Sequence, residues 1–250
     1  VTSDNCGDLS GIDGVEGTVK YDPNTKILRL ENAKLNNAEK EHCIMSGITG
    51  LTIEVIGTNE VSSTSSGVAI YSPTTITGGG TLNSNGRDGS GIYISVNDLT
   101  INNCIVNAKG KYGIVGYDGS KEKLLISKAT VTAEGGYGSI CDFKEITLED
   151  CAITRPAGAV VDNSQGAVVL NGEKVTSEVK IEPITKYDLK ICGTQVTSGN
   201  GGDLSVIPGV EGTVKYDPDS KTLTLEGATI NSTTTNAIVL YMRDLTIKVI

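Results

Sequence analysis

The sequence contains no tryptophan and a single phenylalanine, Phe143, among its 250 residues. A hydrophobic core must therefore be assembled from valine, isoleucine, leucine and alanine, of which the β-branched members favour strands. No window of helical length keeps apolar residues at positions i, i+3, i+4 and i+7. The sequence consequently predicts many short strands and little helix.

Positive charge is scarce as well. The chain carries 30 aspartate and glutamate residues against 21 lysine and arginine residues, which gives a formal net charge of -9. An acidic surface repels phosphate backbones and anionic membranes, so we do not expect nucleic acid as a partner. No apolar run approaches the roughly 18 residues that a transmembrane helix needs, and we expect no membrane insertion.

A long repeat organises the chain. The segment VTSDNCGDLSGIDGVEGTVKYDPNTKILRLENAKLNN from Val1 returns as VTSGNGGDLSVIPGVEGTVKYDPDSKTLTLEGATINS from Val196, and the second copy is introduced by YDLKICGTQ from Tyr187. In both copies, Asp-Pro and the lysine that follows it are typical of the turn of a β-hairpin. We expect this hairpin to cover the first coil of a module, because an uncovered solenoid end exposes core and unpaired backbone.

The long repeat also predicts the domain organisation. Residues 1–183 are predicted to form one β-helix module, with an entrance hairpin at about 17–31 and coils at about 28–183. Residues 184–250 are predicted to hold a linker, the cap and the first coils of a second, truncated copy. Because Ile250 matches Ile56 early in the first copy, we expect the chain to be a window cut from a longer tandem array.

A short repeat recurs about every 22 to 25 residues inside the first module. The first strand of each coil begins with an aliphatic residue or threonine, the second carries a small residue, and the third begins with glycine. The first strands begin at Leu28, Leu51, Thr74, Leu99, Leu124 and Ile146. The small residues of the second strands include Ala33, Cys104, Ala129 and Cys151, and the third strands begin at Gly67, Gly91, Gly113, Gly138 and Gly158.

Strands this short cannot bury their inward faces within a single coil, whereas coils stacked roughly 4.8 Å apart share one continuous core. The sequence therefore predicts an all-β fold. We expect a right-handed, single-stranded parallel β-helix with three short strands per coil, an N-terminal hairpin cap and tandem modules. A β-sandwich also shows short strands at regular intervals, but it gives no reason for three columns to keep their chemical character coil after coil.

None of the six cysteines has the CxxC or CxxH spacing of a zinc site. Cys104 and Cys151 stand where other coils place alanine, which predicts packing inside the core. Two coils separate them, roughly 10 Å, which is too far for a disulfide. His42, the single histidine, precedes Cys43, but neighbours on a strand point to opposite faces, which disfavours a nucleophilic Cys–His pair.

Asp142 and Asp162 close the segments GSICD and GAVVD of consecutive coils, so we expect their Cα atoms to stack about 5 Å apart. Two carboxylates at this distance repel each other, and calcium would compensate them, as would Arg155 or Lys144. Asp142 and Asp162 are therefore the candidate metal ligands, and together with Arg155 they are the candidate catalytic group. The alternative is that both carboxylates simply point into water.

Tyr112, Tyr117 and Tyr137 lie at or beside the third strands and are candidate carbohydrate-binding residues. An exposed tyrosine ring can stack on a sugar while its hydroxyl stays in water. Tyr71 and Tyr241 stand at the same column end as Tyr117. The alternative is that these tyrosines are ordinary strand residues at bends.

The stretch TITGGGTLNSNGRDGSGIYISVNDLTINNCIVNAKGKYGIVG, from Thr75, resembles the pectate-lyase-like β-helices of bacterial surface proteins, especially a carbohydrate-binding β-helix family of gut and cellulolytic bacteria. YDLKICGTQVTS followed by GTVKYDPDSKTLTLEGATI is similar to the module openings of large tandem surface proteins of gut commensals. The resemblance implies a secreted or cell-surface bacterial protein that takes polysaccharide or host glycan as its partner. It implies no required cofactor and admits bound calcium.

These observations support one leading hypothesis and two alternatives. The leading hypothesis is a non-catalytic β-helix module that serves carbohydrate binding or adhesion. The first alternative is a polysaccharide lyase or glycoside hydrolase, but the resemblance implies clustered acidic groups for such enzymes, and Asp142, Asp150 and Asp162 are sparse. The second alternative is a structural spacer or a protein-binding adhesin.

Overall fold

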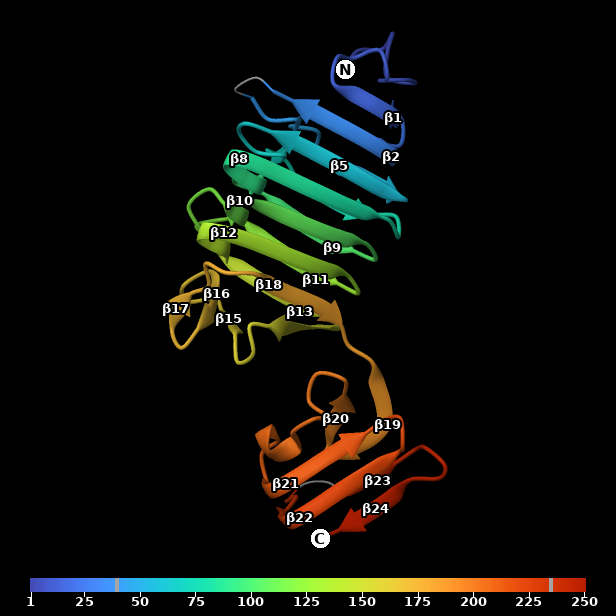
Figure 1. Cartoon of the computed structure of the whole chain (residues 1–250), viewed down its shortest axis with the longest axis vertical. Helices are drawn as coiled ribbons and strands as arrows, with labels where there is room; N and C mark the ends of the chain where they lie inside the picture. Colours follow the sequence, from blue (N-terminus) through green and yellow to red (C-terminus); the bar gives the residue numbers. More distant parts are fainter. Residues whose placement is uncertain (39–40, 234–235) are drawn as a thin grey trace. The chain divides into compact units, whose positions relative to one another are not determined.

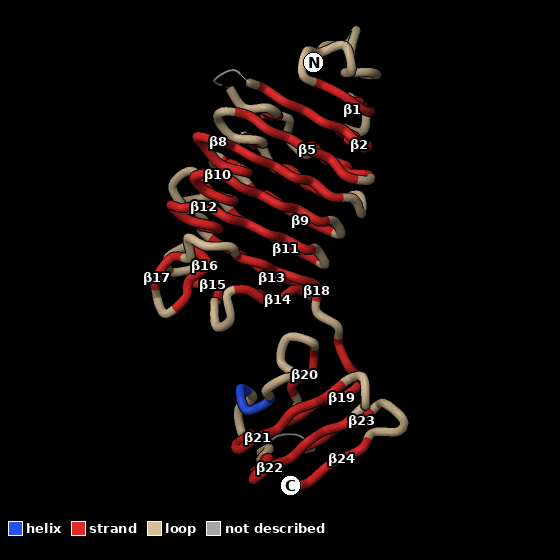
Figure 2. Tube along the Cα trace, viewed as in Figure 1, coloured by secondary structure: helices blue, strands red, loops and turns tan. Residues whose placement is uncertain are grey.

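The computed structural model describes residues 1–38, 41–233 and 236–250, and the chain forms two compact units, Val1–Pro183 and Ile184–Ile250. Strands make up both units, as the ribbon and the tube show (Figures 1 and 2). Within the described ranges, the one helical segment is a 3-10 turn, η1, at Leu204–Val206. The predicted all-β fold is confirmed.

The first unit is a β-solenoid whose coils stack in parallel, as a parallel β-helix requires. The first strands of successive coils form one continuous ladder, in which Leu51 lies beside Thr74 and Thr74 beside Leu99. This ladder is visible in Figure 1 as rungs that follow the sequence colours. Its strands are β2 (Ile27–Asn37), β4 (Leu51–Ile56), β7 (Thr74–Thr77), β9 (Asp98–Asn102), β11 (Lys123–Ser127) and β13 (Glu145–Glu149).

The second and third columns of strands are also parallel ladders. The coil of β4 has three separate strands, as predicted, whereas in later coils the second and third strands run on as one. A register shift between Gly110 and Tyr112 marks the bend between the two parts. These columns consist of β5 (Thr58–Ser63), β3 (Ile44–Ser46), β6 (Val68–Ile70), β8 (Thr81–Ile94), β10 (Ile105–Gly116) and β12 (Thr130–Cys141).

Aliphatic side chains from equivalent positions fill the interior of the solenoid. Ile53, Ile76 and Ile101 follow one another up the first ladder and are fully buried. Complete burial of such a side chain stabilises the fold by about 1.5–3 kcal/mol. Cys104 is 5% exposed, and its thiol donates to the carbonyl oxygen of Ile76 at 3.6 Å, so its predicted packing role is confirmed.

The amide side chain of Asn59, on β5, is completely buried within this stack. Its Oδ1 accepts the N–H of Ala33 at 2.9 Å, and its Nδ2 donates to the carbonyl oxygens of Ile56 and Thr81 at 3.1 and 3.2 Å. These partners belong to three successive coils. Asn59 therefore connects coils through their bends, where the ladder hydrogen bonds are interrupted.

The predicted entrance hairpin is present at the start of the unit. β1 (Val15–Asp22) pairs antiparallel with β2 and covers its outer edge. The Asp22 carboxylate holds the turn, because it accepts the N–H of Asn24 at 2.9 Å and the hydroxyl of Thr25 at 2.8 Å. These hydrogen bonds lower the pKa of Asp22, the one from Thr25 most strongly.

The other end of the first unit differs from the predicted repeat. The segment at Gly158 was expected to form another third strand, but it leads into an antiparallel meander. Pro156 precedes this segment and has no N–H to donate to a ladder, which disfavours further strand pairing at this position. The meander consists of β15 (Val160–Asp162), β16 (Ala167–Leu170) and β17 (Glu173–Lys174).

The second column also ends on an antiparallel strand. β14 (Cys151–Arg155) was expected to stack directly on β12, but β18 (Val179–Pro183) lies between them and runs antiparallel to both. β18 brings Val179 and Ile181, each fully buried, into the core. Alternate side chains of this returning strand are apolar and point inward, so they cover the core as the next coil would have done.

The second unit repeats the entrance of the first. Its hairpin has the same register as β1 and β2, with the same irregularity two residues from its start. Two further strands precede this hairpin, and the first of them pairs antiparallel with the strand Ile238–Leu240. The strands are β19 (Lys186–Ile191), β20 (Thr194–Thr197), β21 (Val210–Asp217), β22 (Thr222–Ile230), β23 (Ile238–Leu240) and β24 (Thr246–Val249).

Replacement of the buried amide tests this account of the coil bends. We expect Asn59→Ala to lower the free energy of unfolding by about 1–3 kcal/mol, because the backbone groups of Ala33 and Ile56 lose their partner. The matched control is Asn85→Ala on the exposed side of β8, which should change stability by less than about 0.5 kcal/mol. Urea unfolding measures both. Equal midpoints for the two variants would contradict the role given to Asn59.

Candidate functional site

The third column of strands, which we call the third sheet, carries a group of tyrosines on its outward side. We call this group the tyrosine face: Tyr71, Tyr93, Tyr112, Tyr117 and Tyr137. Ile92 and Ile114 point into the core, so strand alternation turns Tyr93 and Val115 outward. The ladder places Tyr93 beside Val115, and Val115 beside Cys141. Aromatic and apolar groups therefore follow one another along this outer surface.

Tyr93 is the centre of one half of the tyrosine face. Its ring lies 6.1 Å from that of Tyr71, edge to face, and 6.4 Å from the imidazole of His42, with the planes parallel. The Tyr71 hydroxyl also lies 3.4 Å from Nε2 of His42. Burial raises the pKa of Tyr93, and the nearby Tyr71 and Tyr117 raise it further. Tyr71, Tyr93 and His42 thus form one connected cluster of rings.

Tyr112 and Tyr137 form the other half. Their ring centroids are 5.6 Å apart, so the fold brings these two candidate carbohydrate-binding residues together. Tyr112 packs with Val115 and Cys141 against Ala167 of the meander, a small apolar cluster separate from the solenoid core. Tyr137 remains 64% exposed and Tyr117 62% exposed, so both present ring surface to solvent.

A polar cleft of about 390 Å³ is lined in part by Asp118, the residue that follows Tyr117 in the chain. Its oxygens and nitrogens are already held in place by the fold. Asn163 Oδ1 accepts the N–H of Ile146 at 2.7 Å, and Gln165 Nε2 donates to the Asp162 carboxylate at 2.9 Å. The polar side chains that line the cleft are Asp118, Asp142, Lys144, Asn163, Ser164 and Gln165.

The predicted stacking of Asp162 on Asp142 is wrong. Asp162 ends β15, which pairs with β16 rather than with β12, so no ladder joins the two carboxylates. Asp142 instead forms an ion pair with Lys174, whose Nζ lies 2.7 Å from its Oδ1. Asp162 accepts hydrogen bonds from Ser164 and Gln165 in its own turn, and these lower its pKa. Each acid therefore has its own partner.

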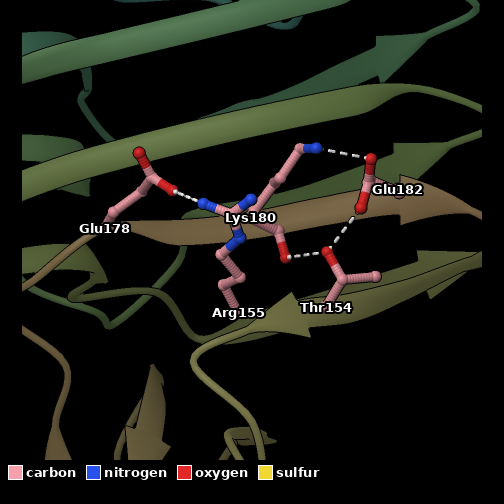
Figure 3. Close-up of polar contacts among 5 residues, drawn as sticks. All are labelled: Thr154, Arg155, Glu178, Lys180 and Glu182. Atoms are coloured by element: carbon pink, nitrogen blue, oxygen red, sulfur yellow. Dashed lines mark hydrogen bonds and ion pairs between the residues drawn. The ribbon is translucent and has the colours of Figure 1, made fainter.

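Arg155 lies on β14 and faces the strand that returns beside it. Its guanidinium contacts the Glu178 carboxylate at 3.2 Å, while Lys180 pairs with Glu182 at 2.6 Å. The Thr154 hydroxyl donates to the same Glu182 carboxylate at 2.6 Å. Figure 3 shows these side chains along β14 and β18. The arginine thus belongs to a surface network that supports the closing strand of the unit.

Among the residues that the structure describes, no set of acidic side chains gathers around Asp142 and Asp162. Calcium takes six to eight oxygen ligands, whereas the described ranges contain no group of three or more aspartate, glutamate, histidine or cysteine residues placed to hold a metal. Lys174 already supplies the cation beside Asp142. Bound calcium remains a prediction without an assigned set of ligands.

The sequence analysis missed two sets of polar residues. Lys174 was missed because the meander that carries it was read as a coil. The second set lies on the outer side of the second column of strands. There Asn107 Nδ2 donates to Asn83 Oδ1 at 2.8 Å, and Lys109 forms an ion pair with Glu134 at 2.8 Å. These side chains line a shallow groove of about 370 Å³. Alternation within β8 and β10 could have revealed it, because their even positions face inward.

His42 and Cys43 do not make a nucleophilic pair. The His42 ring instead lies within hydrogen-bonding distance of Ser65 and Ser66 on the next coil, 3.3 Å from each. Burial raises the pKa of the Cys43 thiol, which disfavours the reactive thiolate. The observed contacts assign His42 to the packing of the tyrosine face.

Comparison with known proteins gives no match among family models, curated proteins or solved structures. A separate search for spanning segments finds that no helix in the described part of the chain is long and apolar enough to cross a membrane. Functional conclusions must therefore rest on the surface chemistry of the solenoid itself.

Thiol labelling tests the assignment of the cysteines. Burial raises the pKa of Cys104 and of Cys141 to about 12. At pH 8 only about one in ten thousand of such thiols is ionised, so we expect neither to react with a thiol reagent before the protein unfolds. Cys6 and Cys192 are half-buried and serve as internal controls that react in the native state. Rapid native labelling of Cys104, located by peptide mass mapping, would contradict its packing role.

Proposed function

We propose that the first unit is a glycan-binding module. The observation that supports this proposal is the tyrosine face, where Tyr117 and Tyr137 are exposed and the ring of Tyr137 contacts the partly buried ring of Tyr112. Sugars present apolar C–H faces to such rings and hydroxyl groups at their edges. The polar cleft beside Tyr117 supplies carboxylate, amide and ammonium groups that can pair with these hydroxyls.

Rigid placement of the rings favours binding further. The tyrosines stand on or beside strands of a packed sheet rather than on a long mobile loop, so little conformational freedom is lost when a ligand binds. Successive coils repeat at roughly 4.8 Å, and Tyr71 and Tyr117 belong to coils two steps apart. The face therefore suits an extended chain of sugar units that lies across several coils.

The proposal describes binding without turnover. The carboxylate of Asp142 is neutralised by Lys174, and Arg155 is engaged by Glu178, so neither is available as an isolated acid or base. We further propose, on the resemblance described above, that the module is pectate-lyase-like in origin and is displayed on or secreted from a bacterial cell, in tandem with other copies.

Affinity electrophoresis tests the function directly. The protein is run through gels that contain polygalacturonate, xylan, cellulose derivatives or mucin glycans, and we expect at least one of these to retard it. The variant Tyr117→Ala/Tyr137→Ala should bind that glycan about fivefold more weakly per ring, as expected for roughly 1 kcal/mol lost at each. Tyr241→Ala, an exposed tyrosine of the second unit, is the matched control and should bind normally.

The outcomes distinguish the alternatives. Free migration in every gel would favour the spacer or protein-binding adhesin over the glycan-binding module. Release of unsaturated products or new reducing ends, abolished by Asp142→Ala or Asp162→Ala, would establish the lyase or hydrolase instead. The gels are repeated with a chelator. If binding needs calcium, the chelator abolishes the retardation.

A further inference from the structure

An apolar cleft of about 440 Å³ lies at the N-terminal end of the first unit. The entrance hairpin forms one wall, and the first coil with β3 forms the other. The cleft carries little polar surface, although it is open to solvent on one side. Among its lining side chains are Leu9, Ile12, Val19, Leu28, Ile44 and Ile48.

The second unit contains the same walls, and there the space between them is filled. Leu204, Ile207 and Val214 are the counterparts of Leu9, Ile12 and Val19 in the long repeat. In the second unit these residues pack into one cluster with Leu189 and Ile191, which come from the lead-in strand β19 and are fully buried. The occupant of the equivalent cleft is therefore an extended strand with alternate apolar residues.

Backbone pairing fixes β19 in that position. It runs antiparallel to β23, with Leu189 opposite Leu240 and Ile191 opposite Ile238. The pairing continues beyond the strand, where Cys192 N–H donates to the carbonyl oxygen of Ala237 at 2.8 Å. In the first unit β3 takes the place of β23. It pairs with β6 along one edge, and no described strand pairs with its other edge.

Exposure of matched residues shows what the strand contributes. Ile12 is 40% exposed, whereas its counterpart Ile207 is 3% exposed. Val1 is 72% exposed, whereas Val196, which follows the lead-in strand, is fully buried. The sequences around these residues are nearly the same, so the difference comes from the covering strand. An exposed apolar wall next to an unpaired sheet edge is a binding site for an added strand.

We propose that the cleft of the first unit receives a lead-in strand of the β19 type, which enters ahead of Val1 as β19 enters ahead of Val196. The strand adds antiparallel to the free edge of β3, and two alternate aliphatic side chains fill the apolar cleft. Its chemistry is that of Lys186–Ile191: apolar at alternate positions and polar between them. Every module of this kind is then completed by the segment that precedes it, so neighbouring modules are joined by a structural strand rather than by a loose linker.

The test adds that strand to the chain. A copy of residues 184–195 is placed directly ahead of Val1, in the order in which the original precedes Val196. We expect the thermal unfolding midpoint of the first unit to rise by about 5 °C or more. We also expect amide hydrogen exchange to slow in β3. The matched control is the same extension with aspartate at the positions that copy Leu189 and Ile191, which should give neither effect.

A second substitution tests the contact itself. Ile12→Asp should cost little in the original chain, where the side chain is already 40% exposed, but it should remove the gain in the extended chain. An extension that leaves the midpoint and the exchange of β3 unchanged would overturn the proposal, as would equal effects from the apolar and aspartate versions. Glycan binding by the tyrosine face is measured separately, so failure of either proposal leaves the other standing.

Discussion

Each coil of the first unit depends on the coils above and below it to enclose its inward side chains. Ile76 is fully enclosed because Ile53 and Ile101 lie on either side of it in the same ladder. A core built in this way is continuous along the stack, and its first and last coils each lack a neighbouring coil and need another element to cover them. Most features that distinguish this solenoid from a simple repeat follow from that requirement.

The two ends of the first unit are covered in different ways. At the start, the hairpin of β1 and β2 protects the first coil, and its turn is held by the Asp22 carboxylate. At the finish, the chain reverses, and β18 enters antiparallel with Val179 and Ile181 directed inward. At both ends an antiparallel strand pairs with the free edge of the last parallel strand. The parallel stack therefore stops there and does not present a further edge to the next coil.

The outer surfaces carry the chemistry that the interior does not constrain. Inward positions must be small or aliphatic in every coil, whereas outward positions accept Tyr93 or Asn107 without loss of core packing. The meander of β15 to β17 then covers part of the third sheet and brings Lys174 to Asp142. The exposed Tyr117 immediately precedes Asp118, which lines a polar cleft together with residues of the meander, so apolar ring surface and hydrogen-bonding groups occur close together in the chain here.

The sequence by itself determined the solenoid, the hairpin cap and the inward role of Cys104, because each rests on local alternation that repeats from coil to coil. It also pointed to Tyr112 and Tyr137 as outward-facing candidates, although their ring contact is known only from the structure. Only the tertiary structure decided where the repeat ends. The segment of β14 continues the sequence pattern of the second column, yet the strand that stacks on β12 is β18, which is distant in sequence. Which distant strands pair with each other depends on the packing of the whole chain. The sequence spacing of Asp142 and Asp162 therefore could not show that no ladder joins them.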